Sequence, residues 1–142
     1  MNTFFPDDLL HDAEALLSEL QRRSLSLAIA ESCTGGLVCG LLTEIPGSSA
    51  VLERGFVTYS NAAKSELLGI DPVLITRHGA VSEEVARAMA EGAAARATVD
   101  IAISVTGDSP NATTAARNGE LVSLVTTGSR RWPEPAGRRS PT

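Results

Sequence analysis

The feature that most constrains the fold is a regular alternation between short apolar runs and helical patterns. Residues 25–30 form a short, mostly apolar run that is typical of a buried strand, and 52–60 and 100–105 are also predicted to be strands. An amphipathic pattern over about 7–23 and an apolar segment over about 35–44 predict helices between them. Strands that alternate with helices predict a single layered α/β/α domain, and we expect its sheet to be mixed.

Capping residues mark where two further helices begin. Asn61 is predicted to be the N-cap of a short helix that closes at Gly69. Ser82 precedes an alanine-rich helix with an acidic first turn. A fourth strand is predicted over 120–126, after a polar stretch without a clear pattern.

Charge and hydropathy exclude several classes of protein. The 142 residues carry a formal net charge of -5, and no basic face builds up that would bind nucleic acid. No apolar run approaches the roughly 18 residues that a membrane-spanning helix needs. Asp7 and Asp8 stand where a signal peptide would carry positive charge. We therefore expect a cytoplasmic protein that binds neither nucleic acid nor membranes.

The two cysteines do not form a pattern typical of metal ligands. Cys33 and Cys39 are six residues apart and lack a CxxC or histidine-rich companion, so a zinc site is not expected. On or beside one helix they would face different directions, too far apart for a disulfide. We expect reduced thiols, and no metal or cofactor.

The C-terminal end differs in composition from the rest of the chain. From Ser129 onward Arg, Pro, Gly and Ser predominate. This composition predicts a domain over 1–128 and a disordered tail over 129–142.

The first candidate site follows the apolar run 25–30. Binding sites of open α/β sheets collect at the carboxyl ends of the strands. A Ser32 hydroxyl at a sharp strand-to-helix turn would be exposed, and the amides around Gly35 and Gly36 could hold an oxyanion or a phosphate. The alternative is a capped helix start, in which Ser32 or Thr34 only accepts hydrogen bonds from backbone amides.

The second candidate site follows the run 52–60. Lys64 is the only lysine among twelve basic residues, and Tyr59 is the only tyrosine. A position near a helix N-terminus and partial burial should lower the pKa of Lys64, so that a neutral amine could take a proton from Ser32. Arginine could not do this, because its guanidinium stays protonated. The alternative is a solvated surface lysine beside a half-buried strand tyrosine.

A third junction, Thr106 and Gly107, follows the run 100–105. It could offer a hydroxyl and amides to the same cleft, or be a simple strand exit. His78 could contact a substrate, although a histidine in a loop before a helix cap is more often structural.

Four stretches of the chain together resemble the CinA C-terminal domain family, which includes nicotinamide-nucleotide amidases and proteins named for competence and damage induction. They lie between residues 8 and 107 in the family's order and spacing. They read AESCTGG, TEIPGSSAVLERGFVTYSNAAKSELLGI, HGAVSEEVARAMAEGA and DIAISVTG.

The resemblance implies hydrolysis of the carboxamide of nicotinamide mononucleotide to nicotinate mononucleotide and ammonia, without a metal. It implies that Ser32 is the nucleophile and that Lys64 and Tyr59 activate it. Cys33 is intrinsically the better nucleophile, but the resemblance gives that role to Ser32. It also implies a homo-oligomer. The residues expected to bind the substrate are Thr34, Gly35, Gly36, Thr106 and Gly107.

The chain departs from the family's pattern after Gly107. The family continues with a glycine-rich loop and a K-P-V-G stretch, whereas residues 108–119 contain a single glycine and no lysine. The C-terminal part is therefore either divergent or truncated, or it is an out-of-frame reading of the gene. Translation of the other two frames of the coding DNA would separate these explanations. The departure leaves a second hypothesis: a catalytically impaired nucleotide-binding or assembly module that retains the fold.

Overall fold

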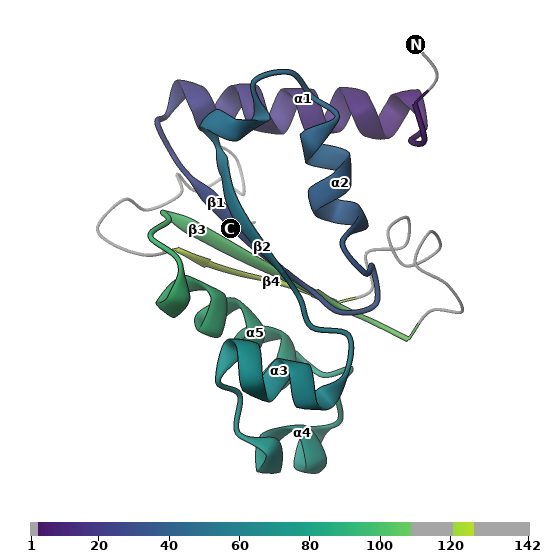
Figure 1. Cartoon of the computed structure of the whole chain (residues 1–142), viewed down its shortest axis with the longest axis vertical. Coiled ribbons are helices and arrows are strands. Elements are labelled where there is room, and N and C mark those ends of the chain that lie inside the picture. Colours follow the sequence, from purple (N-terminus) through teal and green to yellow (C-terminus); the bar gives the residue numbers. More distant parts are fainter. Residues whose placement is uncertain (1–2, 109–120, 127–142) are drawn as a thin grey trace, which may run out of the picture.

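The computed structural model describes residues 3–108 and 121–126, which form a central sheet between two layers of helices. Helices α1 and α2 cover one face of the sheet, and α3, α4 and α5 cover the other (Figure 1). The predicted α/β/α architecture is confirmed. The elements, in chain order, are α1 (Asp7–Arg22), β1 (Leu27–Glu31), α2 (Leu37–Thr43), the short 3-10 helix Ser48–Ala50, β2 (Leu52–Val57), α3 (Asn61–Leu68), α4 (Pro72–His78), α5 (Glu83–Arg96), β3 (Ile101–Thr106) and β4 (Leu121–Thr126).

The sheet is mixed, as predicted, and has the strand order β2-β1-β3-β4. Strand β1 pairs in parallel with both β2 and β3, whereas β4 runs antiparallel to β3. Glu31, the last residue of β1, lies opposite Val57 on one side and Val105 on the other. Because parallel strands end at the same edge of a sheet, the segments that follow β1, β2 and β3 are neighbours.

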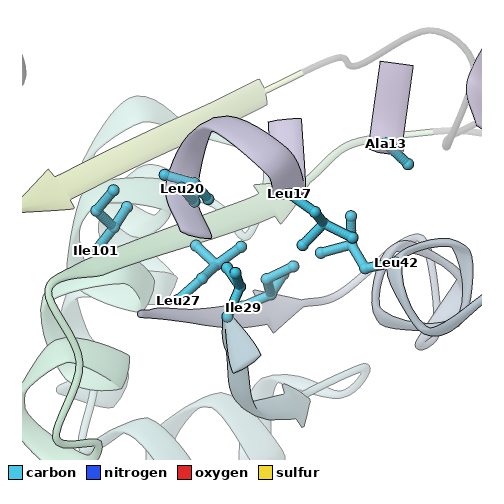
Figure 2. Packing of buried hydrophobic residues seen from close by; sticks show 8 residues of the cluster. Ala13, Leu17, Leu20, Leu27, Ile29, Leu42 and Ile101 are labelled. Atoms are coloured by element: carbon cyan, nitrogen blue, oxygen red, sulfur yellow. The ribbon is translucent and has the colours of Figure 1, made fainter. Parts of the chain in front are cut away.

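The face under α1 and α2 holds the first hydrophobic core. Leu17 and Leu20 of α1 meet Leu27 and Ile29 of β1, and Leu42 of α2 closes the cluster (Figure 2). All five residues of β1 are buried. The continuous apolar run in the sequence reflects this burial on both faces of the strand.

The opposite face packs against α5, which lies along β4 and β3 and also contacts β1. Val85, Met89 and Ala93 of this helix are fully buried and belong to one cluster with Leu68 of α3. The small residues of α5 allow α3 to approach very closely. A Cβ atom on Gly92 would lie 2.3 Å from the carbonyl oxygen of Leu68.

Two boundaries differ from the sequence prediction at the start of helices. Ser60, and not Asn61, is the N-cap of α3: its backbone is extended, and its hydroxyl accepts a hydrogen bond from the Ala63 amide at 3.0 Å. Asn61 is therefore the first helical residue and Lys64 the fourth. Helix α2 begins at Leu37, because Gly35 and Gly36 have positive φ values of 58° and 100° that are not helical.

Helix α4 was not predicted from the sequence. It is short, but its start has recognisable signals: the Asp71 carboxylate accepts from the Val73 amide at 2.9 Å, and Pro72 occupies the first turn. The fourth strand is confirmed as β4. The predicted tail 129–142 lies outside the described residues, and the domain boundary at 128 stays a prediction.

Two helical glycines offer a matched test of this packing. Gly92→Ala should destabilise the protein by about 1–3 kcal/mol, because the new methyl group overlaps backbone that cannot move away easily. Gly40→Ala, in α2, should be neutral or stabilise by up to about 1 kcal/mol, since its Cβ would meet only the ring of Phe5 at 3.7 Å. Urea unfolding of both variants measures the two effects. Equal effects of the two substitutions would contradict the close α3–α5 contact.

Candidate active site

Hydrogen bonds join the segments that follow the three parallel strands. The Ser32 amide donates to the Val105 carbonyl at 2.9 Å, and the Thr58 amide donates to the Glu31 carbonyl at 2.7 Å. The loop that begins at Ser32 therefore starts between the ends of β2 and β3. The residue is only 6% exposed, so the prediction of an exposed hydroxyl at this turn is wrong: Ser32 is buried at the packed edge of the sheet.

Lys64 is a buried basic residue at this edge of the sheet. Its side chain is 1% exposed, and Nζ donates to the carbonyl oxygens of Thr58 at 2.9 Å and Tyr59 at 3.1 Å. Burial lowers the pKa of Lys64 below its usual 10.5, while the nearby Cys33, when charged, acts in the opposite direction. The alternative of a solvated surface lysine is excluded. Burial is the main cause of the lowered pKa. The sequence also predicts a contribution from the N-terminus of α3, but Lys64 is the fourth helical residue and lies one residue farther from that N-terminus than predicted.

The two carbonyl oxygens have a consequence for proton transfer. A neutral amine has two N–H groups and one lone pair, so the carbonyls of Thr58 and Tyr59 can bind both N–H groups and leave the lone pair free. Cys33, the neighbour of Ser32, lies within electrostatic range of this amine. The arrangement is suited to a general base that works on a hydroxyl at the start of the loop.

Glu31 is a functional candidate that the sequence analysis missed. Its side chain is fully buried, and its carboxylate accepts hydrogen bonds from four donors. Oε1 accepts from Thr34 Oγ1 at 2.5 Å, the Gly36 amide at 3.2 Å and the Val38 amide at 2.9 Å, and Oε2 accepts from the Cys39 amide at 3.0 Å. The signal in the sequence was a single acidic residue at the end of an apolar strand, just before a helix.

The loop residues predicted to hold an anion are engaged within the loop. The Gly36 amide and the Thr34 hydroxyl both donate to Glu31. The Gly35 amide donates to the Ser32 carbonyl at 3.1 Å. An oxyanion or phosphate would have to compete with these acceptors for the two glycine amides. A substrate-binding role for Thr34, Gly35 and Gly36 stays a prediction.

The remaining predicted residues lie around the same edge. The buried Thr106 hydroxyl donates to the Ala80 carbonyl at 2.9 Å and so ties β3 to the segment before α5. Gly107 follows it and is partly exposed. Tyr59 is 73% exposed, and its backbone carbonyl accepts the hydrogen bond from Lys64. His78 lies at the end of α4, with Nδ1 3.7 Å from a carboxylate oxygen of Glu84.

The two cysteines have different surroundings, and no disulfide joins them. Burial, followed by the charge of Glu31, raises the pKa of Cys39 to about 12. Its sulfur packs where Gly55 leaves room, so Cys39 is an inert packing residue. Cys33 lies in the electrostatic range of Lys64. Within residues 3–108 and 121–126, no cluster of His, Cys, Asp or Glu is suited to hold a metal, and no helix is long and apolar enough to cross a membrane.

The fold and the site define a class: a layered α/β protein with a buried lysine and a serine-bearing loop at the carboxyl ends of parallel strands. Comparison with known proteins gives the family. The family model of the CinA C-terminal domain matches residues 10–128, and this chain belongs to that family.

Relatives and solved structures agree with this assignment. A CinA-like protein of Syntrophus aciditrophicus is 54% identical over 101 residues, which are 71% of this chain and 24% of that protein. A CinA-like protein of Chlorobaculum tepidum is 53% identical over 94 residues, 66% of this chain and 22% of the relative. The chain therefore spans less than a quarter of the length of these relatives.

Two crystal structures show the same fold. The competence/damage inducible protein of Agrobacterium tumefaciens has a TM-score of 0.74 at 45% identity, covering 78% of this chain and 67% of that one. A CinA superfamily protein of Escherichia coli has a TM-score of 0.70 at 34% identity, covering 78% of this chain and 69% of that one.

The buried amine can be titrated directly, because Lys64 is the only lysine. With lysine labelled at 13Cε, the NMR spectrum should contain one lysine signal, and its midpoint should lie below 10.5 because burial disfavours the ammonium. Cys33→Ser should lower the midpoint further, since a negative charge that favours the ammonium is removed. A midpoint at or above 10.5 in the folded protein would contradict the burial of the amine.

Proposed function

We propose that this chain is a serine amidohydrolase that deamidates nicotinamide mononucleotide to nicotinate mononucleotide and ammonia. The observation that carries the proposal is the buried Lys64 amine, held by two carbonyls beside the loop that begins with Ser32. A buried lysine with a lowered pKa is a recognised activating base for a serine nucleophile. The choice of the nucleotide amide rests on the resemblance to the nicotinamide-nucleotide amidases.

The proposed reaction has two stages. In the first, neutral Lys64 accepts the proton of the Ser32 hydroxyl while the oxygen attacks the carboxamide carbon. The protonated amine then gives the proton to the departing nitrogen, so that ammonia leaves and an ester on Ser32 remains. In the second stage Lys64 takes a proton from water and the hydroxide attacks the ester. The lysine ammonium then gives that proton to the departing Ser32 oxygen, which regenerates the hydroxyl and the neutral amine and releases nicotinate mononucleotide.

Tyr59 has a different place in this proposal from Lys64. Its carbonyl accepts a hydrogen bond from the lysine amine, whereas the residue itself is largely exposed. We therefore favour direct proton transfer from Ser32 to Lys64 over a relay through the Tyr59 hydroxyl. Thr106 and Gly107 would line the opposite side of the site. As the resemblance implies, we propose a cytoplasmic homo-oligomer that needs no cofactor.

The second candidate function is a nucleotide-binding or assembly module without catalysis. The observation in its favour is the composition of 108–119, which lacks the family's glycine cluster and lysine. The two functions differ in one measurable respect: the module would bind nicotinamide mononucleotide tightly without releasing ammonia.

Substitution of the two central residues tests the enzyme proposal. Ser32→Ala and Lys64→Met should each reduce ammonia release by at least about 10²-fold, because the first removes the nucleophile and the second the base. The native rate should rise with pH as Lys64 loses its proton, with a midpoint below 10.5. Coupled assays of ammonia and nicotinate mononucleotide give both results.

The control for these variants is Ser49→Ala, an exposed serine in the 3-10 helix. It should keep the native rate. Far-UV circular dichroism should show the same fold in all variants. Native activity in either Ser32→Ala or Lys64→Met would contradict the mechanism.

A further inference from the structure

The charge of Glu31 is satisfied in an unusual way. No Lys, Arg or His forms an ion pair with its carboxylate in the part of the chain that the structure describes. Its partners are three backbone amides at the start of α2 and the Thr34 hydroxyl, all of which are neutral donors. The N-terminal end of a helix carries partial positive charge, so the helix itself stabilises this carboxylate. A fully buried carboxylate would otherwise be very costly.

The side chain of Glu31 determines the shape of the loop that contains Ser32. Its carboxylate accepts hydrogen bonds from residues at the beginning, middle and end of the turn, from Thr34 to Cys39. Its own backbone directly precedes Ser32. The loop is therefore held at both ends by one residue, and the position of the Ser32 hydroxyl depends on these four bonds.

The backbone of Glu31 reaches the lysine as well. Its carbonyl accepts from the Thr58 amide at 2.7 Å and from the Thr58 hydroxyl at 3.2 Å. The Thr58 carbonyl in turn accepts from Lys64 Nζ at 2.9 Å. Ser32 is thus connected to the amine by the peptide bond to Glu31, the hydrogen bond from Thr58 to Glu31 and the hydrogen bond from Lys64 to Thr58.

From these contacts we infer that Glu31 is the positioning residue of the site: its carboxylate holds the Ser32 loop and its carbonyl holds the turn that carries the lysine's acceptors. The inference rests on the proposed function, because it assumes that Ser32 and Lys64 react together.

A serine-reactive probe tests the inference without depending on the substrate. A fluorophosphonate ester phosphonylates an activated serine hydroxyl and releases fluoride, and mass spectrometry locates and times the modification. Glu31→Gln keeps the size of the side chain but turns an NH₂ group toward at least one backbone N–H. It should slow phosphonylation of Ser32 by about 10- to 100-fold, as expected for a misplaced nucleophile. Thr34→Val, which removes one of the four donors, should slow it less.

The matched control separates positioning from general stability. Leu17→Ala leaves a cavity in the core under α1, which Val38 and Cys39 also border, but it removes none of the hydrogen bonds of Glu31. It should lower the melting temperature at least as much as Glu31→Gln, yet keep the native labelling rate at a temperature where all variants are folded. The kcat for amide hydrolysis should follow the labelling rates.

The outcomes distinguish this inference from the proposed function. Native protein labelled at Ser32, Lys64→Met unlabelled and Glu31→Gln slowed would support the inference. Equal labelling of native protein and Glu31→Gln would overturn it and leave the enzyme proposal standing, and so would equal slowing in Glu31→Gln and Leu17→Ala. Absence of labelling at Ser32 in the native protein would overturn the proposed function and this inference with it.

Discussion

Parallel pairing on both sides of β1 is the constraint on which the rest of the structure depends. It places the ends of three strands at one edge of the sheet, and two hydrogen bonds then bind the end of β1 to its neighbours, from Ser32 to Val105 and from Thr58 to Glu31. The serine loop and the turn before α3 are far apart in the chain, but this pairing leaves them in contact. The cores on the two faces of the sheet keep β1 buried and so maintain that edge.

The site contains a buried carboxyl group and a buried amine that have separate hydrogen-bond partners. The carboxylate of Glu31 is bound by amides and a hydroxyl, and the amine of Lys64 is bound by carbonyls. A carboxylate paired directly with Lys64 would favour the ammonium and raise the pKa of the lysine. Glu31 instead bonds the start of α2, and burial is the largest influence on Lys64, whose pKa it lowers.

Much of this arrangement could be predicted from the sequence, because it follows from local patterns. The apolar runs gave the strands, and Ser82 was recognised as the N-cap of α5, where its hydroxyl accepts from the Val85 amide. The lone lysine pointed to Lys64. Errors came where two local signals compete: Ser60 and Asn61 are both good N-caps, and only the extended backbone at Ser60 decides between them.

The role of Glu31 could not be predicted, because it depends on contacts that the sequence does not show. An acidic residue next to a serine is usually solvated. Its burial follows from the pairing of β1 on both sides, and its hydrogen bonds follow from the two positive-φ glycines that turn the start of α2 back over it. Similarly, the segment 52–60 is predicted as one strand, but β2 ends at Val57, and Thr58 beyond it still bonds the Glu31 carbonyl through its amide.

The central claim is that Ser32, and not its neighbour Cys33, forms a covalent acyl intermediate with help from Lys64. Acid quenching of the protein during turnover of nicotinamide mononucleotide, followed by fragmentation mass spectrometry, tests it most directly. The account predicts that the acyl group is found as an ester on Ser32 in the native protein and is absent from Lys64→Met. An acyl group on the sulfur of Cys33, or turnover without any covalent intermediate, would contradict it.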